Sequence, residues 1–144
     1  MTIRDANPTD ARALWQLNEQ FNGADTHEYA SLRRALEMGG SELVTVAEVD
    51  GHLVGFICGQ VTISFCYPAP CAEITELYVE AAHRRHGVAG ALVREMERRF
   101  RAHGASEIRL LTGAKNHTAR AFYEKMGYAM ANGVEYCKQS TERE

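Results

Sequence analysis

A short run of basic and small residues in the second half of the chain has the spacing of an anion-binding turn. In the segment RRHGVA, Arg84 is followed three residues later by Gly87 and two residues after that by Ala89. The two small residues would let the backbone pass close to a bulky anion, and the amides of residues 85–90 would be free at the start of the following helix. Such amides lack intrahelical partners and lie at the positive end of the helix dipole. The segment therefore predicts a site for a diphosphate-bearing cofactor.

The cysteines and histidines indicate no second chemical site. His83 and His86 stand three residues apart, but no nearby cysteine or carboxylate completes a set of metal ligands, so we expect no metal. The four cysteines are scattered, and reduced thiols are the default in the cytosol. A covalent acyl-enzyme at Cys66 or Cys71 would need a partner base, and the sequence offers none.

Hydrophobic periodicity and turn signals divide the chain into helices and strands that must position this turn. Asn7 is a good N-cap, Pro8 suits the first helical position, and Asp50-Gly51 is a strong two-residue hairpin signal. The strand–helix–strand order over 72–112 implies a parallel crossover, and the whole pattern predicts a mixed α/β layer of sheet with helices on both faces. The expected strands cover 2–6, 42–49, 52–65, 72–79, 108–112 and 133–138, and the expected helices cover 8–22, 27–38, 88–103 and 118–126.

Two of the expected helices carry an apolar stripe along one face. Such a stripe is typical of a helix that packs against a core. The polar stretch 22–26, just before the second helix, would form a mobile lip. The stripes consist of Tyr29, Leu32 and Leu36 in the second helix, and of Leu92, Val93, Met96 and Phe100 in the helix after the turn.

Length and charge restrict the class of protein. The chain has 144 residues and a net charge of −3, which fits one domain over 1–139 with a disordered tail over 140–144. No apolar run approaches the ~20 residues that span a bilayer, and the N-terminus has no signal-peptide core, so we expect a cytoplasmic protein with no membrane partner. The net charge argues against a nucleic-acid partner, and the mixed charges of the run REMERRFR indicate a solvated helix face.

Two blocks of sequence together resemble a known family. The segment LYV at 77–79, four residues, and then RRHGVA resemble the acyl-CoA signature of the GNAT superfamily of N-acetyltransferases, Q/R-x-x-G-x-G/A. Downstream, Asn116 and then AFYEKMGY resemble the family's segment in which an Asn precedes a helix that bears a Tyr and ends at Gly-aromatic. The order of elements also agrees over essentially the whole chain. The resemblance implies a central mixed, mostly antiparallel sheet of about six or seven strands with helices on both faces.

The resemblance implies acetyl-CoA as cosubstrate and a role for each matching residue. Arg84 would frame the turn, and Asn116 would donate a hydrogen bond to the pantetheine arm near the thioester, although an N-cap is the alternative role for Asn116. The backbone at 77–79 would pair with the pantetheine amides like an added strand, and an amide there would polarise the acetyl carbonyl. The expected cofactor contacts are Leu77, Tyr78 and Val79 for the arm, and Arg85, His86, Gly87, Val88, Ala89 and Gly90 for the pyrophosphate.

Tyr123 is the candidate general acid. When an amine attacks the thioester, the leaving thiolate needs a proton, and a phenol with a pKa of ~10 can supply one. The alternative is that Tyr123 packs with Phe122 and Met126 in the core.

The candidate general base is a carboxylate of the strand that leads into LYV, and for each carboxylate the alternative is a solvent-facing side chain with no catalytic role. Some family members place their base four residues before that segment, which matches Glu73, and others immediately before it, which matches Glu76. Strict alternation would send the two side chains to opposite faces of the sheet unless a bulge intervenes. A third arrangement, with a Glu five residues before the Asn, is excluded because Leu111 stands there. We favour Glu76 because it is next to the acyl-binding segment.

These expectations add up to an N-acetyltransferase that transfers the acetyl group directly to a primary amine, most simply that of a small cationic molecule. The alternatives are acetylation of a protein N-terminus or lysine, and a non-catalytic acyl-CoA-binding or sensing module. The strand expected at 133–138 would offer an edge for a homodimer, as the resemblance implies. Acidic residues would attract the cationic acceptor and two aromatic residues would line its site: Asp25, Glu28, Glu73 and Glu76, with Phe65 and Tyr67.

Overall fold

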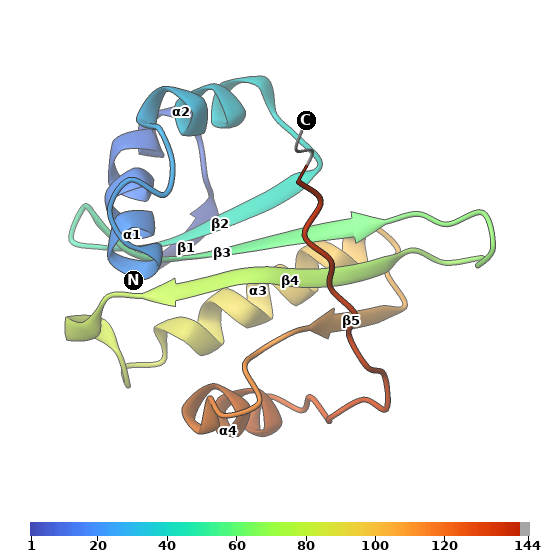
Figure 1. The fold of residues 1–144 in the computed structure, drawn as a ribbon. Coiled ribbons are helices and arrows are strands. Elements are labelled where there is room, and N and C mark those ends of the chain that lie inside the picture. Colours follow the sequence, from blue (N-terminus) through green and yellow to red (C-terminus); the bar gives the residue numbers. More distant parts are fainter. Residues whose placement is uncertain (142–144) are drawn as a thin grey trace. The chain divides into compact units, whose positions relative to one another are not determined.

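The computed structural model describes residues 1–141, and their strands form one sheet (Figure 1). Neighbouring strands are antiparallel up to β4, and β4 and β5 are parallel, which confirms the predicted crossover. The strands, in both chain and spatial order, are β1 (Thr2–Asp5), β2 (Glu42–Val49), β3 (His52–Thr62), β4 (Cys71–Val79) and β5 (Glu107–Leu110).

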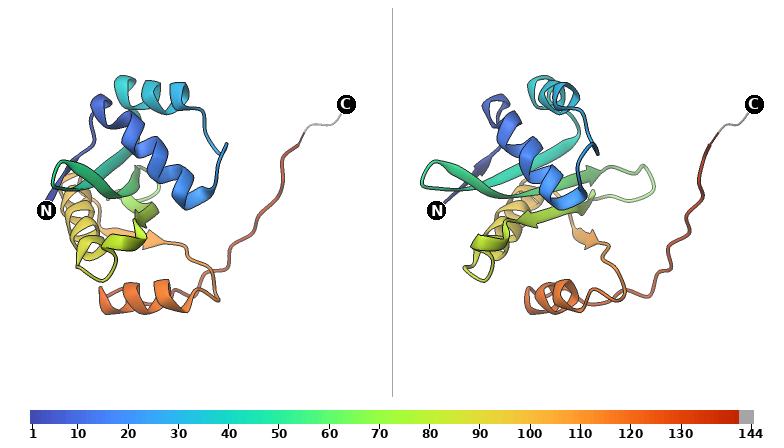
Figure 2. Two further views of the ribbon diagram at one scale, coloured as in Figure 1. Left: turned by 90° about the vertical axis from the view of Figure 1, so that its left-hand side faces the viewer. Right: turned by 60° about the vertical axis from the view of Figure 1, so that its left-hand side comes forward.

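Helices cover both faces of this sheet (Figures 1 and 2). Helices α1 (Ala11–Asn22) and α2 (Tyr29–Met38) lie on one face, and α3 (Val88–Ala102) lies on the other. The mixed, mostly antiparallel α/β fold with helices on both faces is therefore confirmed. These elements belong to the first of two compact units, Met1–Leu111, whereas α4 (His117–Lys125) belongs to the second, Thr112–Glu144. The expectation of a single domain over 1–139 stays a prediction.

The entry into α1 follows the predicted capping signal. The side chain of Asn7 accepts a hydrogen bond from Thr9 N at 2.9 Å, and Asp10 accepts one from Asn7 N at 2.8 Å, which together form a capping box. Pro8 starts a 3-10 turn (Pro8–Asp10) rather than the α-helix itself. The guanidinium of Arg4 holds the nearly buried Asp10 through two bonds of 2.8 Å, and these bonds lower the pKa of its carboxyl group.

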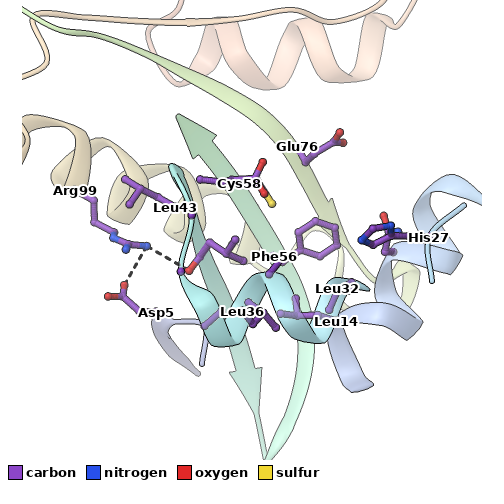
Figure 3. Close-up of a pocket in the computed structure, with 17 residues that line it drawn as sticks. Asp5, Leu14, His27, Leu32, Leu36, Leu43, Phe56, Cys58, Glu76 and Arg99 are labelled. Atoms are coloured by element: carbon purple, nitrogen blue, oxygen red, sulfur yellow. Dashed lines mark hydrogen bonds and ion pairs between the residues drawn. The ribbon is translucent and has the colours of Figure 1, made fainter. Parts of the chain in front are cut away.

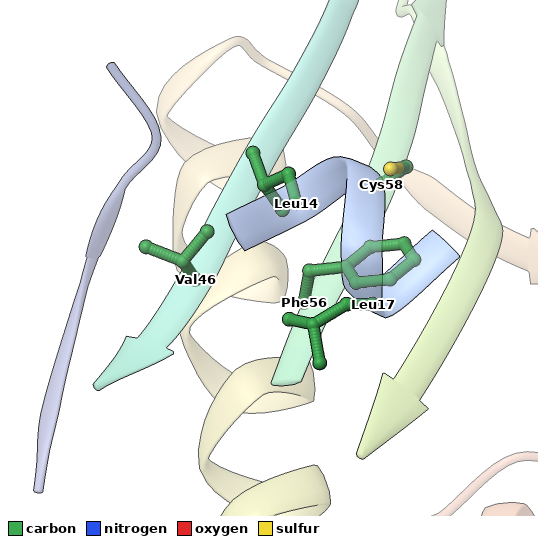
Figure 4. Close-up of a cluster of buried hydrophobic side chains, with 5 residues drawn as sticks. All are labelled: Leu14, Leu17, Val46, Phe56 and Cys58. Carbon is green, nitrogen blue, oxygen red and sulfur yellow. The ribbon is translucent and has the colours of Figure 1, made fainter. Parts of the chain in front are cut away.

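The core lies in two layers, one on each face of the sheet. On the α1 face, Leu14 and Leu17 pack against Val46, Phe56 and Cys58 (Figure 4). On the α3 face, the predicted stripe of that helix is fully buried: Leu92, Val93, Met96 and Phe100 each have 0% exposure.

The predicted strand count is wrong by one or two strands. The segment expected as a closing strand at 133–138 has no strand pairing among the described residues, so their sheet has five strands rather than six or seven. Val134 and Tyr136 favour a strand by composition, but a strand needs a ladder partner, and both side chains are exposed at 77% and 94%. Of the tail expected to be disordered, Ser140 and Thr141 lie outside helix and strand, and 142–144 lie outside the described residues.

Candidate active site

The turn between β4 and α3 has the geometry of a helix start with unoccupied amides. Gly87 is the N-cap of α3 with φ +81°, a left-handed conformation that glycine adopts without strain, and Arg85 is also left-handed with φ +65°. The first intrahelical bond runs from Ala91 N to Gly87 O at 3.1 Å, so the amides of 88–90 precede it. A Cβ built on Gly87 would meet no atom within 4 Å, which means that space is open beside the turn.

Arg84 connects this turn to the preceding strand, β4. Its Nε donates to Val79 O at 2.9 Å, and its guanidinium lies 5.6 Å from the centre of the Tyr78 ring. The Tyr78 hydroxyl in turn donates to Gln20 Oε1 at 3.1 Å, and its ring stacks on Phe21 at the end of α1. Arg84 therefore holds the turn against β4, and Tyr78 ties β4 to α1.

The end of β4 leaves one edge without a strand partner. The parallel pairing with β5 stops at Ile74 and Leu110, whereas β4 continues to Val79. On that side, residues 75–79 have no strand beside them among residues 1–141. The backbone at 77–79, expected to contact the pantetheine arm, lies within this unpaired edge.

A bulge in β4 brings the two candidate bases to the same face of the sheet. Cys58 pairs with Glu76 but Gly59 pairs with Ile74, so Thr75 is an extra residue in β4. Phe56 and Cys58 point toward α1, hence Gln60 and its partner Glu73 do as well. The bulge breaks the strict alternation of side chains along β4. Both carboxylates therefore lie on the face that α1 and α2 cover.

The two carboxylates nevertheless line different cavities. Glu76 lines an open groove of about 470 Å³ between α1, α2 and strands β2 to β4 (Figure 3). Glu73 lines a second cavity of about 520 Å³, formed by the β3–β4 loop and the start of β5. Of the two aromatic residues expected to line the acceptor site, Tyr67 lines this second cavity, and Phe65 is fully exposed. Asp25 and Glu28 are exposed in the loop before α2, where His27 rather than either acid lines the groove.

The groove combines an apolar floor with carboxylates. Burial, and secondarily the charge of Glu42, raise the pKa of Glu76 above its usual value. Cys58 lies next to both acids, and burial together with their charges raises the pKa of its thiol. Thr75, the bulged residue, donates from its hydroxyl to Glu42 Oε2 at 3.4 Å. Glu42 therefore belongs to the site, and sequence reasoning missed it, because only the register of three strands brings it near Glu76.

Asn116 and Tyr123 lie in the second unit. Asn116 caps α4, since its Oδ1 accepts from Ala119 N at 3.1 Å, and the Nδ2 group of the same amide can still donate to a ligand. The Tyr123 ring packs edge-to-face against Phe122 and Tyr128, and burial raises the pKa of its hydroxyl. A raised pKa keeps the phenol protonated, as a proton donor must be.

Residues 11–128 match the sequence model of the Acetyltransferase (GNAT) family, and the chain belongs to that family. Over 93 residues it is 32% identical to acetyltransferase SG1711 of Sodalis glossinidius (strain morsitans), a match covering 65% of this chain and 61% of that protein. The chain spans between 40% and 61% of the length of the first curated relatives that it matches.

Solved structures share the fold at low sequence identity. One is a ribosomal-protein-alanine N-acetyltransferase from Brucella melitensis biovar Abortus 2308, with a TM-score of 0.84, 21% identity and coverage of 97% of this chain and 100% of that chain. Another is the aminoglycoside acetyltransferase meta-AAC0020 from an uncultured soil metagenomic sample, in complex with sisomicin, with a TM-score of 0.83, 18% identity and coverage of 98% and 96%. One names a protein substrate and the other a small molecule, so the shared fold does not fix the acceptor.

No helix of the described chain has the length and apolarity that crossing a bilayer requires. Within residues 1–141, His, Cys, Asp and Glu form no group of three or more that could hold a metal ion.

Proposed function

We propose that this acetyltransferase transfers the acetyl group of acetyl-CoA directly to the primary amine of a small cationic molecule. The observation that carries the proposal is the register of β4 on β3. Glu76 pairs with Cys58, whose side chain packs with α1, so Glu76 faces the groove immediately before the strand edge that residues 77–79 leave unpaired.

The first unit fits the pantetheine arm and pyrophosphate of acetyl-CoA. The free edge at 77–79 offers backbone groups to the two amides of the arm. The amides of 88–90, the left-handed residues Arg85 and Gly87, and the open space at Gly87 suit a diphosphate. Arg84 acts by bracing the turn, because its Nε is bonded to Val79 O.

Three proton transfers accompany the reaction. An alkylamine with a pKa of ~10.4 is almost wholly protonated at neutral pH and must lose a proton before it attacks. Glu76 accepts that proton, directly or through water, and its raised pKa makes it a better base than an ordinary carboxylate. Acetyl-CoA supplies the activated acetyl group. As the new C–N bond forms and the C–S bond breaks, Tyr123 donates a proton to the sulfur, and the nitrogen loses its second proton to the resulting tyrosinate, which restores the phenol. Asn116 positions the arm.

The test is release of the CoA thiol from acetyl-CoA in the presence of a diverse panel of amines. With an amine that is turned over, we expect Glu76→Gln to lower kcat by about 10²–10⁴-fold, the range of general base catalysis. Glu73→Gln is the matched variant on the same strand and the same face, and it should retain most of the rate. Tyr123→Phe should lower kcat far more than it weakens CoA binding.

Each outcome bears on a separate part of the proposal. If no amine is turned over but CoA binds tightly, the proposed enzymatic activity is overturned, and the alternative of a non-catalytic acyl-CoA-binding module remains. Loss of rate in Glu73→Gln but not in Glu76→Gln would move the base to the second cavity. An unchanged rate in Tyr123→Phe would remove the acid assignment.

A further inference from the structure

The groove at Glu76 has one apolar wall, built mainly by α1, α2 and β3. Leu14 and Phe56 form its base, and Leu32 and Leu36 of α2 face them (Figure 3). No residue of α2 is buried, so its leucine stripe is only partly covered by protein. Leu32 and Leu36 pack against the buried cluster on this face and also line the open groove, where their exposed parts can pack against an apolar ligand.

The opposite wall carries two carboxylates, and the described lining of the groove supplies no unpaired arginine or lysine to balance them. Glu76 of β4 pairs with Cys58 of β3, and Glu42 of β2 pairs with Gln60 two residues along the same strand. Both carboxylates line the groove, and after burial their charges raise the pKa of the Cys58 thiol. The Thr75 hydroxyl is the polar group joined to Glu42, and it brings no charge. Glu76 therefore has a second carboxylate near it, an arrangement that favours an ammonium group between the two.

Arg99, the arginine in the described lining of the groove, is already neutralised. Arg99 of α3 pairs with Asp5 at 3.1 Å and also donates to Thr45 Oγ1 at 2.7 Å and to Val44 O at 3.3 Å. The Asp5 charge cancels that of Arg99, so the unbalanced charge of the described lining is that of Glu42 and Glu76. His27 is the remaining titratable nitrogen of the lining, and it lies in the loop before α2.

Resting on the proposed function, we propose that the acceptor is a small monoamine whose single ammonium group stands on an apolar, aromatic or branched aliphatic body. The ammonium group lies between Glu42 and Glu76, and the body packs against Leu32, Leu36 and Phe56. A cavity of about 470 Å³ is within the range of small-molecule sites. An aminoglycoside would leave its hydroxyl groups unpaired against this wall, and a polyamine would lay its further charges on it, and both are costly.

Thiol release with matched amines tests this proposal. We use 2-phenylethylamine as the apolar monoamine, with spermidine, an aminoglycoside and a peptide with a free N-terminus as competitors. We expect kcat/KM for 2-phenylethylamine to exceed that of each competitor by about tenfold or more, the discrimination that apolar contacts can provide. A higher kcat/KM for any competitor overturns the proposal and leaves the proposed function standing.

A pair of variants on one helix locates the binding wall. Leu36→Gln should raise KM for 2-phenylethylamine by about tenfold while kcat changes little, because the apolar contact is the same in ground and transition states. Met38→Gln makes the same kind of change two residues away at a position 77% exposed and outside the groove, and it should leave KM unchanged. Equal KM values in the wild type and Leu36→Gln, with both folded, overturn the placement.

A binding measurement separates this inference from the proposed function. In the absence of acetyl-CoA, 2-phenylethylamine at saturation should raise the thermal unfolding temperature of the wild type and of Met38→Gln, but less that of Leu36→Gln. If no amine is turned over but these thermal shifts are observed, the proposed reaction is wrong and the proposed class of ligand is right. If amines are turned over and 2-phenylethylamine gives no shift that depends on Leu36, the ligand class is wrong.

Discussion

The two faces of this sheet are closed to different degrees. On the α3 face, four side chains of the helix are completely buried, and Gly59 leaves room on the sheet for the Phe100 ring. On the other face, α1 contributes buried leucines, whereas α2 buries no residue and leaves a groove of about 470 Å³. One face therefore supplies most of the packing that stabilises the sheet, and the other can hold an open site because stability depends on it less.

The largest expected effect comes from truncating the closed face. Phe100→Ala removes a ring with 0% exposure and should lower the free energy of unfolding by about 3–5 kcal/mol. Leu36→Ala, on the partly buried face of α2, should lower the free energy of unfolding by about 1 kcal/mol or less, because the Leu36 side chain already contacts solvent. Equilibrium denaturation in urea measures both. Similar costs at the two positions would contradict the comparison.

A smaller effect is expected from overfilling the same face. A Cβ on Gly59 would overlap Cζ of Phe100 and lie 2.8 Å from its Cε1 and 3.1 Å from Met96 Sδ. Gly59→Ala should therefore destabilise the protein by about 1–3 kcal/mol, since the rigid ring must move within a full core. The same substitution in a Phe100→Leu background should cost less, and a double-mutant cycle measures the difference. If the two changes in the free energy of unfolding were additive, the Phe100 ring would not be the cause of the destabilisation by Gly59→Ala.

Sequence periodicity predicted the closed face better than the open one. The stripe of Leu92, Met96 and Phe100 is buried as its spacing indicated, because a continuous core gives helical periodicity a direct meaning. The Leu32 and Leu36 stripe has the same local pattern and packs against the core cluster, yet it is only partly buried and also borders a groove. A local pattern shows which face is apolar but not whether protein or ligand covers it.

The site itself was predictable where its signal was local. The helix start at Gly87 and the capping role of Asn116, given above as the alternative role of that residue, follow from residue type and spacing. The bulge at Thr75 carries no such signal in β4, which has neither Gly nor Pro, and it depends on the register between β3 and β4. The shared face of Glu73 and Glu76, and the approach of Glu42, both follow from that register.

The smallest expected effect concerns the charge of the open face, and it separates the two carboxylates of the groove. Glu42 raises the pKa of Glu76, and Glu76 must be deprotonated to accept a proton from the amine. Glu42→Gln removes the neighbouring negative charge, so the pKa of Glu76 falls and the acid limb of kcat/KM moves to lower pH.

The matched control is Glu48→Gln, which removes a carboxylate 3.6 Å from Arg4, outside the groove lining, and should leave the limb in place. Because the same amine is used throughout, its own titration contributes equally to all profiles, and the difference reports the enzyme group. A limb that stays in place or moves to higher pH in Glu42→Gln would mean that Glu42 does not act on the base. The acidity of the open face would then come from Glu76 alone, and the ammonium would be held by one carboxylate instead of two.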